Sequence, residues 1–173
     1  MTTTWVRQSK QQTIDPRSQQ SLSWSQLSDL ADAGVGIGAH SCSHPQLDQL
    51  PDSRLEAELR VSKEILESKL GRPVMGIAYP FGYSNVRVRR MARSVGYKYA
   101  CVVGNRTLNL SDDLFALPRL TISRSTHLRE FDRIVKGQGV ESIFLKERML
   151  TKGWAMFRRT RFMLRNLPYA SKA

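Results

Sequence analysis

Two histidines that follow a short apolar run constrain this chain more than any other feature. The run, residues 35–39, is rich in glycine and too short for a helix, so it predicts a buried strand with His40 and His44 at and just past its end. Neutral imidazole is a common ligand of zinc and related ions. A metal site is one interpretation. A pair of polar loop residues that caps the next segment is the other, because catalytic zinc normally has three protein ligands.

A second apolar run ends in an aromatic turn. Residues 76–83 read Gly-Ile-Ala-Tyr-Pro-Phe-Gly-Tyr, which predicts a strand followed by a Pro-aromatic-Gly turn. Tyr79 and Tyr83 offer either aromatic faces for sugar rings or ordinary packing at a turn. The sequence leaves both readings open.

In combination and in order, these stretches resemble the polysaccharide deacetylase family, which is built on the NodB homology domain and is carbohydrate esterase family 4-like. Residues 40–45 are similar to its His-Ser/Thr-x-x-His-Pro metal motif, and residues 79–82 to its Arg/Tyr-Pro-x-Gly groove motif. Further stretches add to the resemblance: residues 22–27, 70–74 and 116–120. The family's Thr-Phe-Asp-Asp-Gly motif, which should precede the histidines, is absent from this sequence.

Alternating strand and helix patterns predict an α/β fold with parallel strands. Strands are expected at residues 35–39, 74–79, 97–103 and 117–122. Helices are expected to begin at Ser23, with Gln26 completing a capping box, at Asp52 or Ser53, at Asn85 and near Thr126. The resemblance narrows this architecture to a partial distorted (β/α) barrel of the polysaccharide deacetylase type, without its first strand or two.

The chemistry that the resemblance implies is removal of an acetyl group. Such hydrolysis needs a polarised carbonyl, an activated water, a base and an acid. The resemblance implies a divalent metal on His40 and His44, with zinc favoured, and an oxyanion donor in the Phe81 N–H. It places the substrate and oxyanion side of the site at five residues: Tyr79, Pro80, Phe81, Gly82 and Tyr83.

The base and third metal ligand of the family are aspartates of the absent motif. Asp15 lies in a polar lead-in, and Asp29 and Asp32 lie on a helix expected to face solvent, so none of them is a convincing replacement. Arg119 matches a family arginine that orients the catalytic aspartate, or it pairs with a carboxylate inside the fold. His127 matches the family's final histidine, the acid for the leaving amine, or it occupies a surface position at a helix start.

Two further pairs of reactive side chains have simpler interpretations. Cys42 lies between the two histidines and is either a soft ligand or, like Cys101, an ordinary free thiol near the core. Two cysteines are too few for a disulfide framework. Asp112 and Asp113 precede a predicted strand, so we interpret them as turn residues and not as a catalytic acid and base.

Charge divides the chain unevenly. The net charge is +12, and the residues from Lys146 onward contribute eight Lys or Arg residues against one Glu. Together with the polar composition of the first residues and the extent of the resemblance, this charge divides the chain into three parts. They are a polar, poorly ordered lead-in (residues 1–21), a NodB-like domain (22–140) and a basic amphipathic tail (141–173). The tail suits an anionic membrane surface, or it packs its apolar stripe onto the barrel. Nucleic acid is not an expected partner, because the basic residues outside the tail have no interleaved aromatics.

The predicted function is metal-dependent hydrolysis of N- or O-acetyl groups on a polysaccharide or an amino-sugar oligomer. As an enzyme the chain would be a hydrolase of carbon–nitrogen bonds other than peptide bonds, with activity impaired because the aspartate motif is missing. The alternative is a non-catalytic remnant of the fold that binds carbohydrate or a membrane. Residues 1–20 do not form a signal peptide and no run is long enough to span a bilayer, so we expect a cytoplasmic or membrane-peripheral protein.

Overall fold

The structure, a computed structural model, describes residues 3–5 and 21–165. The chain divides into two compact units. The first comprises Met1–Val102 and Leu110–Leu117, and the second comprises Val103–Asn109 and Pro118–Ala173. The histidine pair and the aromatic turn belong to the first unit, whereas Arg119 and His127 belong to the second.

The strands are short and parallel where their pairing is defined. β1 (Thr3–Trp5) pairs in parallel with β2 (Gly36–Gly38), and β3 (Gly76–Ala78) pairs in parallel with β4 (Tyr99–Val103). With β5 (Leu117–Arg119), the second sheet has the order β3-β4-β5. A single parallel bridge between Ala39 and Ile77 links β2 to β3. Four of these strands lie within the predicted segments, and the predicted parallel α/β arrangement is confirmed.

β1 was not predicted. It lies in the polar lead-in, where the sequence has no alternating apolar pattern, and it forms only through pairing with residues more than 30 positions away. Residues 1–2 and 6–20 of the lead-in lie outside the described part of the chain.

Local signals set most helix ends in the first unit. α1 (Trp24–Asp32) begins after Ser23, whose hydroxyl accepts the Gln26 N–H while the Gln26 side chain accepts the Ser23 N–H, so the predicted capping box is confirmed. α3 (Val86–Ser94) is capped by the Asn85 side chain, which accepts the Val88 N–H at 2.9 Å, also as predicted.

α2 (Asp52–Leu70) begins differently from the prediction. Its N-cap is Pro51, which makes no side-chain cap bond, so the expected cap at Asp52 or Ser53 was wrong. Pro51 has extended backbone angles, and the helix starts directly after it. The helix ends at Gly71, whose φ of 62° gives the left-handed turn that glycine adopts without strain.

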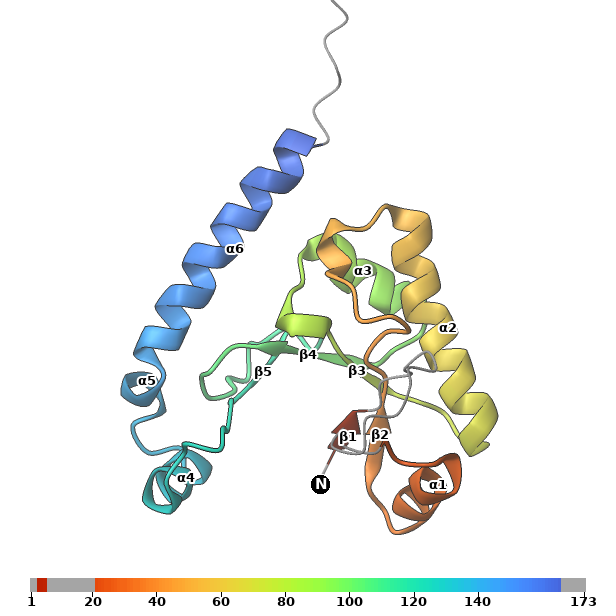
Figure 1. Cartoon of the computed structure of the whole chain (residues 1–173), viewed down its shortest axis with the longest axis horizontal. Coiled ribbons are helices and arrows are strands. Elements are labelled where there is room, and N and C mark those ends of the chain that lie inside the picture. Colours follow the sequence, from red (N-terminus) through yellow and green to blue (C-terminus); the bar gives the residue numbers. More distant parts are fainter. Residues whose placement is uncertain (1–2, 6–20, 166–173) are drawn as a thin grey trace, which may run out of the picture. The chain divides into compact units, whose positions relative to one another are not determined.

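The core of the first unit lies between its helices and strands. α2 packs against both α1 and α3 (Figure 1). Apolar side chains from these helices and from β3 and β4 form one buried cluster, whose fully buried members include Leu27, Leu55, Leu59, Ile77, Val88, Ala92 and Ala100. Gly76 fits here because the Tyr99 ring on β4 occupies the space that a Cβ would need. This core holds the ends of β2 and β3 in fixed register.

The second unit contains α4 (Leu128–Val135), α5 (Val140–Ile143) and α6 (Leu145–Arg165). Ile134, Val140 and Phe144 form its small buried cluster. Several large apolar side chains of α6 are exposed: Leu145, Met149, Leu150, Trp154, Met156 and Phe157. Within residues 3–5 and 21–165, no helix is both long and apolar enough to cross a membrane.

Candidate metal centre

The candidate site begins where β2 and β3 end. The Ala39 N–H donates to the Gly76 carbonyl and the Ala78 N–H donates to the Ala39 carbonyl, both at 2.9 Å. Because the two strands run in parallel, the residues that follow them, His40 and Tyr79, emerge at the same edge. This edge brings the two predicted motifs together.

The two histidine rings lie in contact. Their centroids are 4.9 Å apart and their planes are inclined by 64°. His40 Nδ1 lies 2.6 Å from the Ala78 carbonyl oxygen. A carbonyl oxygen only accepts, so Nδ1 carries the proton and Nε2 of the neutral ring carries the lone pair. A histidine that donates one ring N–H to a backbone carbonyl is held as metal-binding histidines usually are.

The donor set fits two positions of a metal site. In the described ranges, no group of three or more His, Cys, Asp or Glu side chains is arranged to hold a metal ion. Asp29 and Asp32 are exposed on α1, and Asp32 forms an ion pair with Arg72. Asp15 lies outside the described residues. The two histidines therefore suit a divalent ion whose remaining ligands come from elsewhere.

The loop between the histidines has an unusual backbone. Ser41 and His44 both adopt left-handed conformations, with φ of 62° and 59°. For residues other than glycine such a conformation costs roughly 1–2 kcal/mol each. The His44 N–H donates to the Ser41 hydroxyl at 3.0 Å, and Ser41 itself is buried. Strain of this kind persists only where surrounding contacts determine the conformation.

Glu58 of α2 supplies several of those contacts, although the sequence does not indicate what it binds. Its carboxylate accepts the N–H groups of Cys42 and Ser43, each at 2.9 Å, and the hydroxyl of Ser43. Glu58 is only 9% exposed. The sequence separation of about 15 residues and the absence of any local motif explain why pattern analysis does not find this contact.

The surroundings of Cys42 disfavour a role as metal ligand. Its Sγ lies 3.8 Å from the Glu58 backbone carbonyl, to which it donates. Burial, and then the negative charge of Glu58, raise the pKa of the Cys42 thiol. Since the thiolate is the form that binds metal, this environment disfavours the soft-ligand interpretation.

The aromatic turn lies beside the histidines. It forms the short 3-10 helix η2 (Pro80–Gly82), closed by bonds from the Gly82 N–H to the Tyr79 carbonyl and from the Tyr83 N–H to the Pro80 carbonyl. Phe81 has a left-handed backbone, with φ of 58°, and is 48% exposed. Its ring contacts His44 with centroids 4.6 Å apart and stacks on Tyr83 at 5.6 Å. Phe81 therefore presents an aromatic surface next to the histidine pair.

Tyr79 does not share that surface. Its side chain is fully buried, and its hydroxyl donates to the Phe115 carbonyl at 3.2 Å. Burial raises the pKa of the Tyr79 phenol, which therefore stays protonated and able to donate. Of the two readings that the sequence left open for Tyr79, packing is the one that this burial supports. Pro80 is buried as well.

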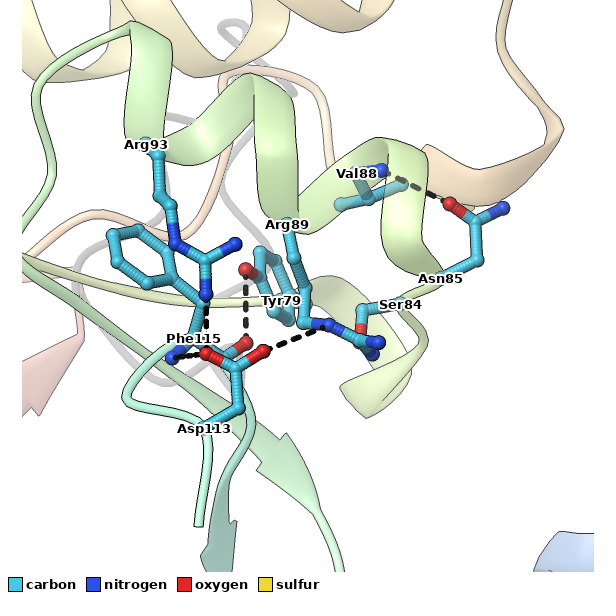
Figure 2. Close-up of polar contacts among 8 residues, drawn as sticks. All are labelled: Tyr79, Ser84, Asn85, Val88, Arg89, Arg93, Asp113 and Phe115. Carbon is cyan, nitrogen blue, oxygen red and sulfur yellow. Dashed lines mark hydrogen bonds and ion pairs between the residues drawn. The ribbon is translucent and has the colours of Figure 1, made fainter. Parts of the chain in front are cut away.

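Asp113 lies in a cluster of charges shown in Figure 2. It accepts the Phe115 N–H at 2.9 Å and forms ion pairs with Arg93 and, at 3.2 Å, with Arg89 of α3. The Arg93 guanidinium also lies over the Phe115 ring, 4.4 Å from its centroid. Burial alone would raise the pKa of Asp113, but the Phe115 N–H and the two guanidiniums outweigh it and lower the pKa. Asp113 is thus a turn residue held by arginines, in agreement with the sequence interpretation.

The remaining candidates lie in the second unit. His127 is the exposed N-cap of α4 and makes no side-chain cap bond, which is the surface position that sequence analysis offered as the alternative. Arg119 ends β5, and its carbonyl accepts the Asn105 N–H at 2.9 Å. The catalytic roles of Arg119 and His127 stay predictions.

Comparison with known proteins identifies the family. The family model described as polysaccharide deacetylase matches residues 1–100, which include β1, the histidine motif and the aromatic turn. The chain belongs to the polysaccharide deacetylase family. The matched range includes the residues of the predicted lead-in, and the division of the chain into lead-in, domain and tail stays a prediction.

Known relatives match this chain at modest identity. The curated Bacillus subtilis protein named "Putative polysaccharide deacetylase YxkH" is 24% identical over 102 residues, which are 59% of this chain and 37% of that protein. The deacetylase PplD of Streptococcus pyogenes, solved in complex with acetate, matches with a TM-score of 0.63 and 22% identity over 71% of this chain and 53% of PplD. BC0361, a polysaccharide deacetylase from Bacillus cereus, matches with a TM-score of 0.57 and 29% identity over 65% of this chain and 36% of BC0361.

These matches define what the chain contains. Its fold is part of the (β/α) barrel of polysaccharide deacetylases, and the chain spans about half or less of the relatives it matches. The predicted family and fold class are confirmed. No comparison supports contact with a membrane, so the membrane partner of the tail stays a prediction.

Proposed function

We propose that this chain carries the metal-binding edge of a carbohydrate deacetylase site, which acts on N- or O-acetyl groups of a polysaccharide or amino-sugar oligomer. The observation that carries the proposal is the histidine pair. Two imidazoles lie in contact beside the end of β3, and the His40 ring is fixed by its bond to the Ala78 carbonyl. The family membership of residues 1–100 supports the reaction class.

Each residue of this edge has a role in the proposal. His40 and His44 hold a divalent ion, for which zinc is the favoured candidate given two nitrogen ligands. When bound, such an ion polarises an acetyl carbonyl and makes water a better nucleophile. The Phe81 N–H donates to the carbonyl oxygen as negative charge develops there, an interaction worth roughly 3 kcal/mol. The exposed ring of Phe81 and the half-buried ring of Tyr83 stacked on it border the substrate, whereas the buried Tyr79 packs inside the core.

The proposal also holds that the 173-residue chain lacks the general base and a further metal ligand of the site. Hydrolysis needs a base for the water proton, and loss of a general base costs roughly 10²–10⁴-fold. The family assigns that base, and a further metal ligand, to aspartates of the Thr-Phe-Asp-Asp-Gly motif, which this sequence does not contain. We therefore expect residues 1–173 alone to bind metal weakly and to release little acetate.

Acetate release from an acetylated amino-sugar oligomer tests the proposal. The 173-residue chain is compared with a version extended at its N-terminus by a family segment that bears the two aspartates, with zinc present. The extended version should turn over the substrate, and a His40→Ala change in it should abolish turnover. Strong zinc-dependent turnover by the unextended chain would contradict the claim that residues 1–173 lack a base. Inactivity of the extended version that still binds the oligomer would favour the non-catalytic, carbohydrate-binding alternative.

A further inference from the structure

Glu58 stands apart from the other acidic side chains of α2. Glu56 and Glu64 pair with Arg60 on the exposed side of the helix, and Glu67 pairs with Lys63. Glu58 is buried instead, and the three bonds that its carboxylate accepts all come from Cys42 and Ser43. The ion pairs found within the described residues include none to Glu58. This carboxylate is committed to the loop between the two histidines.

The loop needs such a partner because of its shape. Left-handed residues at Ser41 and His44 fold residues 40–44 back on themselves, which brings the two rings into contact. In that fold the N–H groups of Cys42 and Ser43 point to Glu58 of α2. Two N–H groups at a partly buried turn require acceptors, and one Glu58 oxygen accepts both.

From this geometry we propose that Glu58 is a positioning residue of the metal site. It holds residues 41–43 in the conformation that aims both imidazoles at one ion, and it acts through hydrogen bonds and not through its charge on the ion. The inference rests on the proposed function, because it concerns how the same histidine pair is held. It adds a residue of α2 that touches neither the metal nor the substrate.

Two substitutions separate hydrogen bonding from charge. Glu58→Gln keeps an oxygen that can accept both N–H bonds, and its amide NH₂ can donate to the Ser43 hydroxyl, which accepts as well as donates. Glu58→Met keeps the length of the side chain but replaces both carboxylate oxygens with a thioether sulfur, which is only a weak acceptor. Glu67→Met is the matched control, since Glu67 lies on the same helix and accepts the Val74 N–H at 2.8 Å, far along the helix from the histidine loop.

The experiment measures zinc affinity by isothermal titration and the visible spectrum of bound Co²⁺ in the four 173-residue chains. Glu58→Met should weaken zinc binding by about 10–100-fold, the range that follows loss of a residue that orients metal ligands. Glu58→Gln should retain most of the wild-type affinity and the wild-type spectrum, and so should Glu67→Met. Equal affinities in wild type and Glu58→Met would overturn the proposal. So would a Glu58→Gln variant as weak as Glu58→Met, since charge would then be the cause.

A readout without metal keeps this test separate from that of the proposed function. Amide hydrogen exchange at Cys42 and Ser43 should accelerate in Glu58→Met, but not in Glu58→Gln, relative to the Tyr79 amide that pairs with β4. If wild type binds no zinc, the proposed function fails. Hydrogen exchange alone then tests whether Glu58 holds residues 41–43 in place. Unchanged protection in Glu58→Met would then overturn its positioning role.

Discussion

Two carboxylates hold two loops of the first unit, and they do so with opposite kinds of partner. Glu58 is buried and holds the histidine loop through neutral N–H and O–H donors. Asp113 is about one-third exposed and holds its own turn through two guanidiniums and one N–H. The Glu58 anchor depends on the direction of its hydrogen bonds, and the Asp113 anchor depends mainly on charge. A site that must aim two rings needs the directional anchor, whereas a turn that only needs to stay docked on α3 can rely on ion pairs.

The comparison also explains which acidic residues suit chemistry. Asp113 has a lowered pKa and is engaged on three sides, so it is a poor base and a good anchor (Figure 2). An adjacent pair of aspartates looks catalytic in a sequence, but its second member, Asp113, binds the Phe115 N–H and two arginines of α3. The contrast leads to three predictions, in decreasing order of expected effect.

Asp113→Ala should have the largest effect on stability and none on metal binding. It removes the ion pairs with Arg89 and Arg93 and the acceptor of the Phe115 N–H, and it should cost about 2 kcal/mol after allowance for solvent screening. Urea denaturation measures the cost. As a control, Asp132→Asn breaks an exposed pair with Lys136 and should cost less than about 0.5 kcal/mol. Loss of zinc affinity in Asp113→Ala would show that the two anchors are not independent.

Asp113→Asn tests, through pH and salt, whether Asp113 stabilises its turn by charge, in contrast to Glu58. The folded-state pKa of Asp113 is lowered, so its contribution is present above the unfolded-state value near pH 4 and is lost as pH falls through the lower folded value. The stability difference between wild type and Asp113→Asn, about 1 kcal/mol at neutral pH, should shrink in acid and in high salt. The effect of Glu58→Met on the histidine loop should persist in high salt. A salt-independent Asp113→Asn difference would contradict the role assigned to charge.

Tyr79→Phe should have the smallest effect. The change removes one hydroxyl, which donates to the Phe115 carbonyl inside the core, and should cost about 0.5–1 kcal/mol of unfolding free energy. Because Tyr79 is fully buried, zinc affinity and oligomer binding should not change. Weaker binding of an acetylated oligomer by Tyr79→Phe, at unchanged zinc affinity, would instead favour the interpretation in which Tyr79 contacts the substrate.

Sequence patterns predicted the parts of the fold that depend on neighbouring residues. The Ser23 capping box and the Asn85 cap each act within a few residues, and each lies where the pattern placed it. β1 depends on pairing with distant β2, and its polar sequence carries no local signal. The start of α2 shows the same limit, because a side-chain cap at Asp52 or Ser53 was equally compatible with the sequence.

At the candidate site, sequence patterns indicated the histidine pair but not the backbone conformation that brings its rings together. The spacing of His40 and His44 predicted that they could converge, and their rings do lie in contact. Left-handed backbone at Ser41 and His44 could not be predicted, since neither is glycine or asparagine. Glu58 could not be found either, because helical patterning of α2 says only that a polar residue is misplaced on a buried face and not what it binds.

Zinc titration of the 173-residue chain tests the central claim, that the histidine pair is half of a metal site. Wild type and a His40→Ala, His44→Ala double variant are titrated by calorimetry, with Asp113→Ala as a control for nonspecific loss of stability. We expect weak binding to wild type and to Asp113→Ala, and none to the double variant, because two imidazoles supply only part of the usual ligand set. Equal heats for wild type and the double variant would contradict the account.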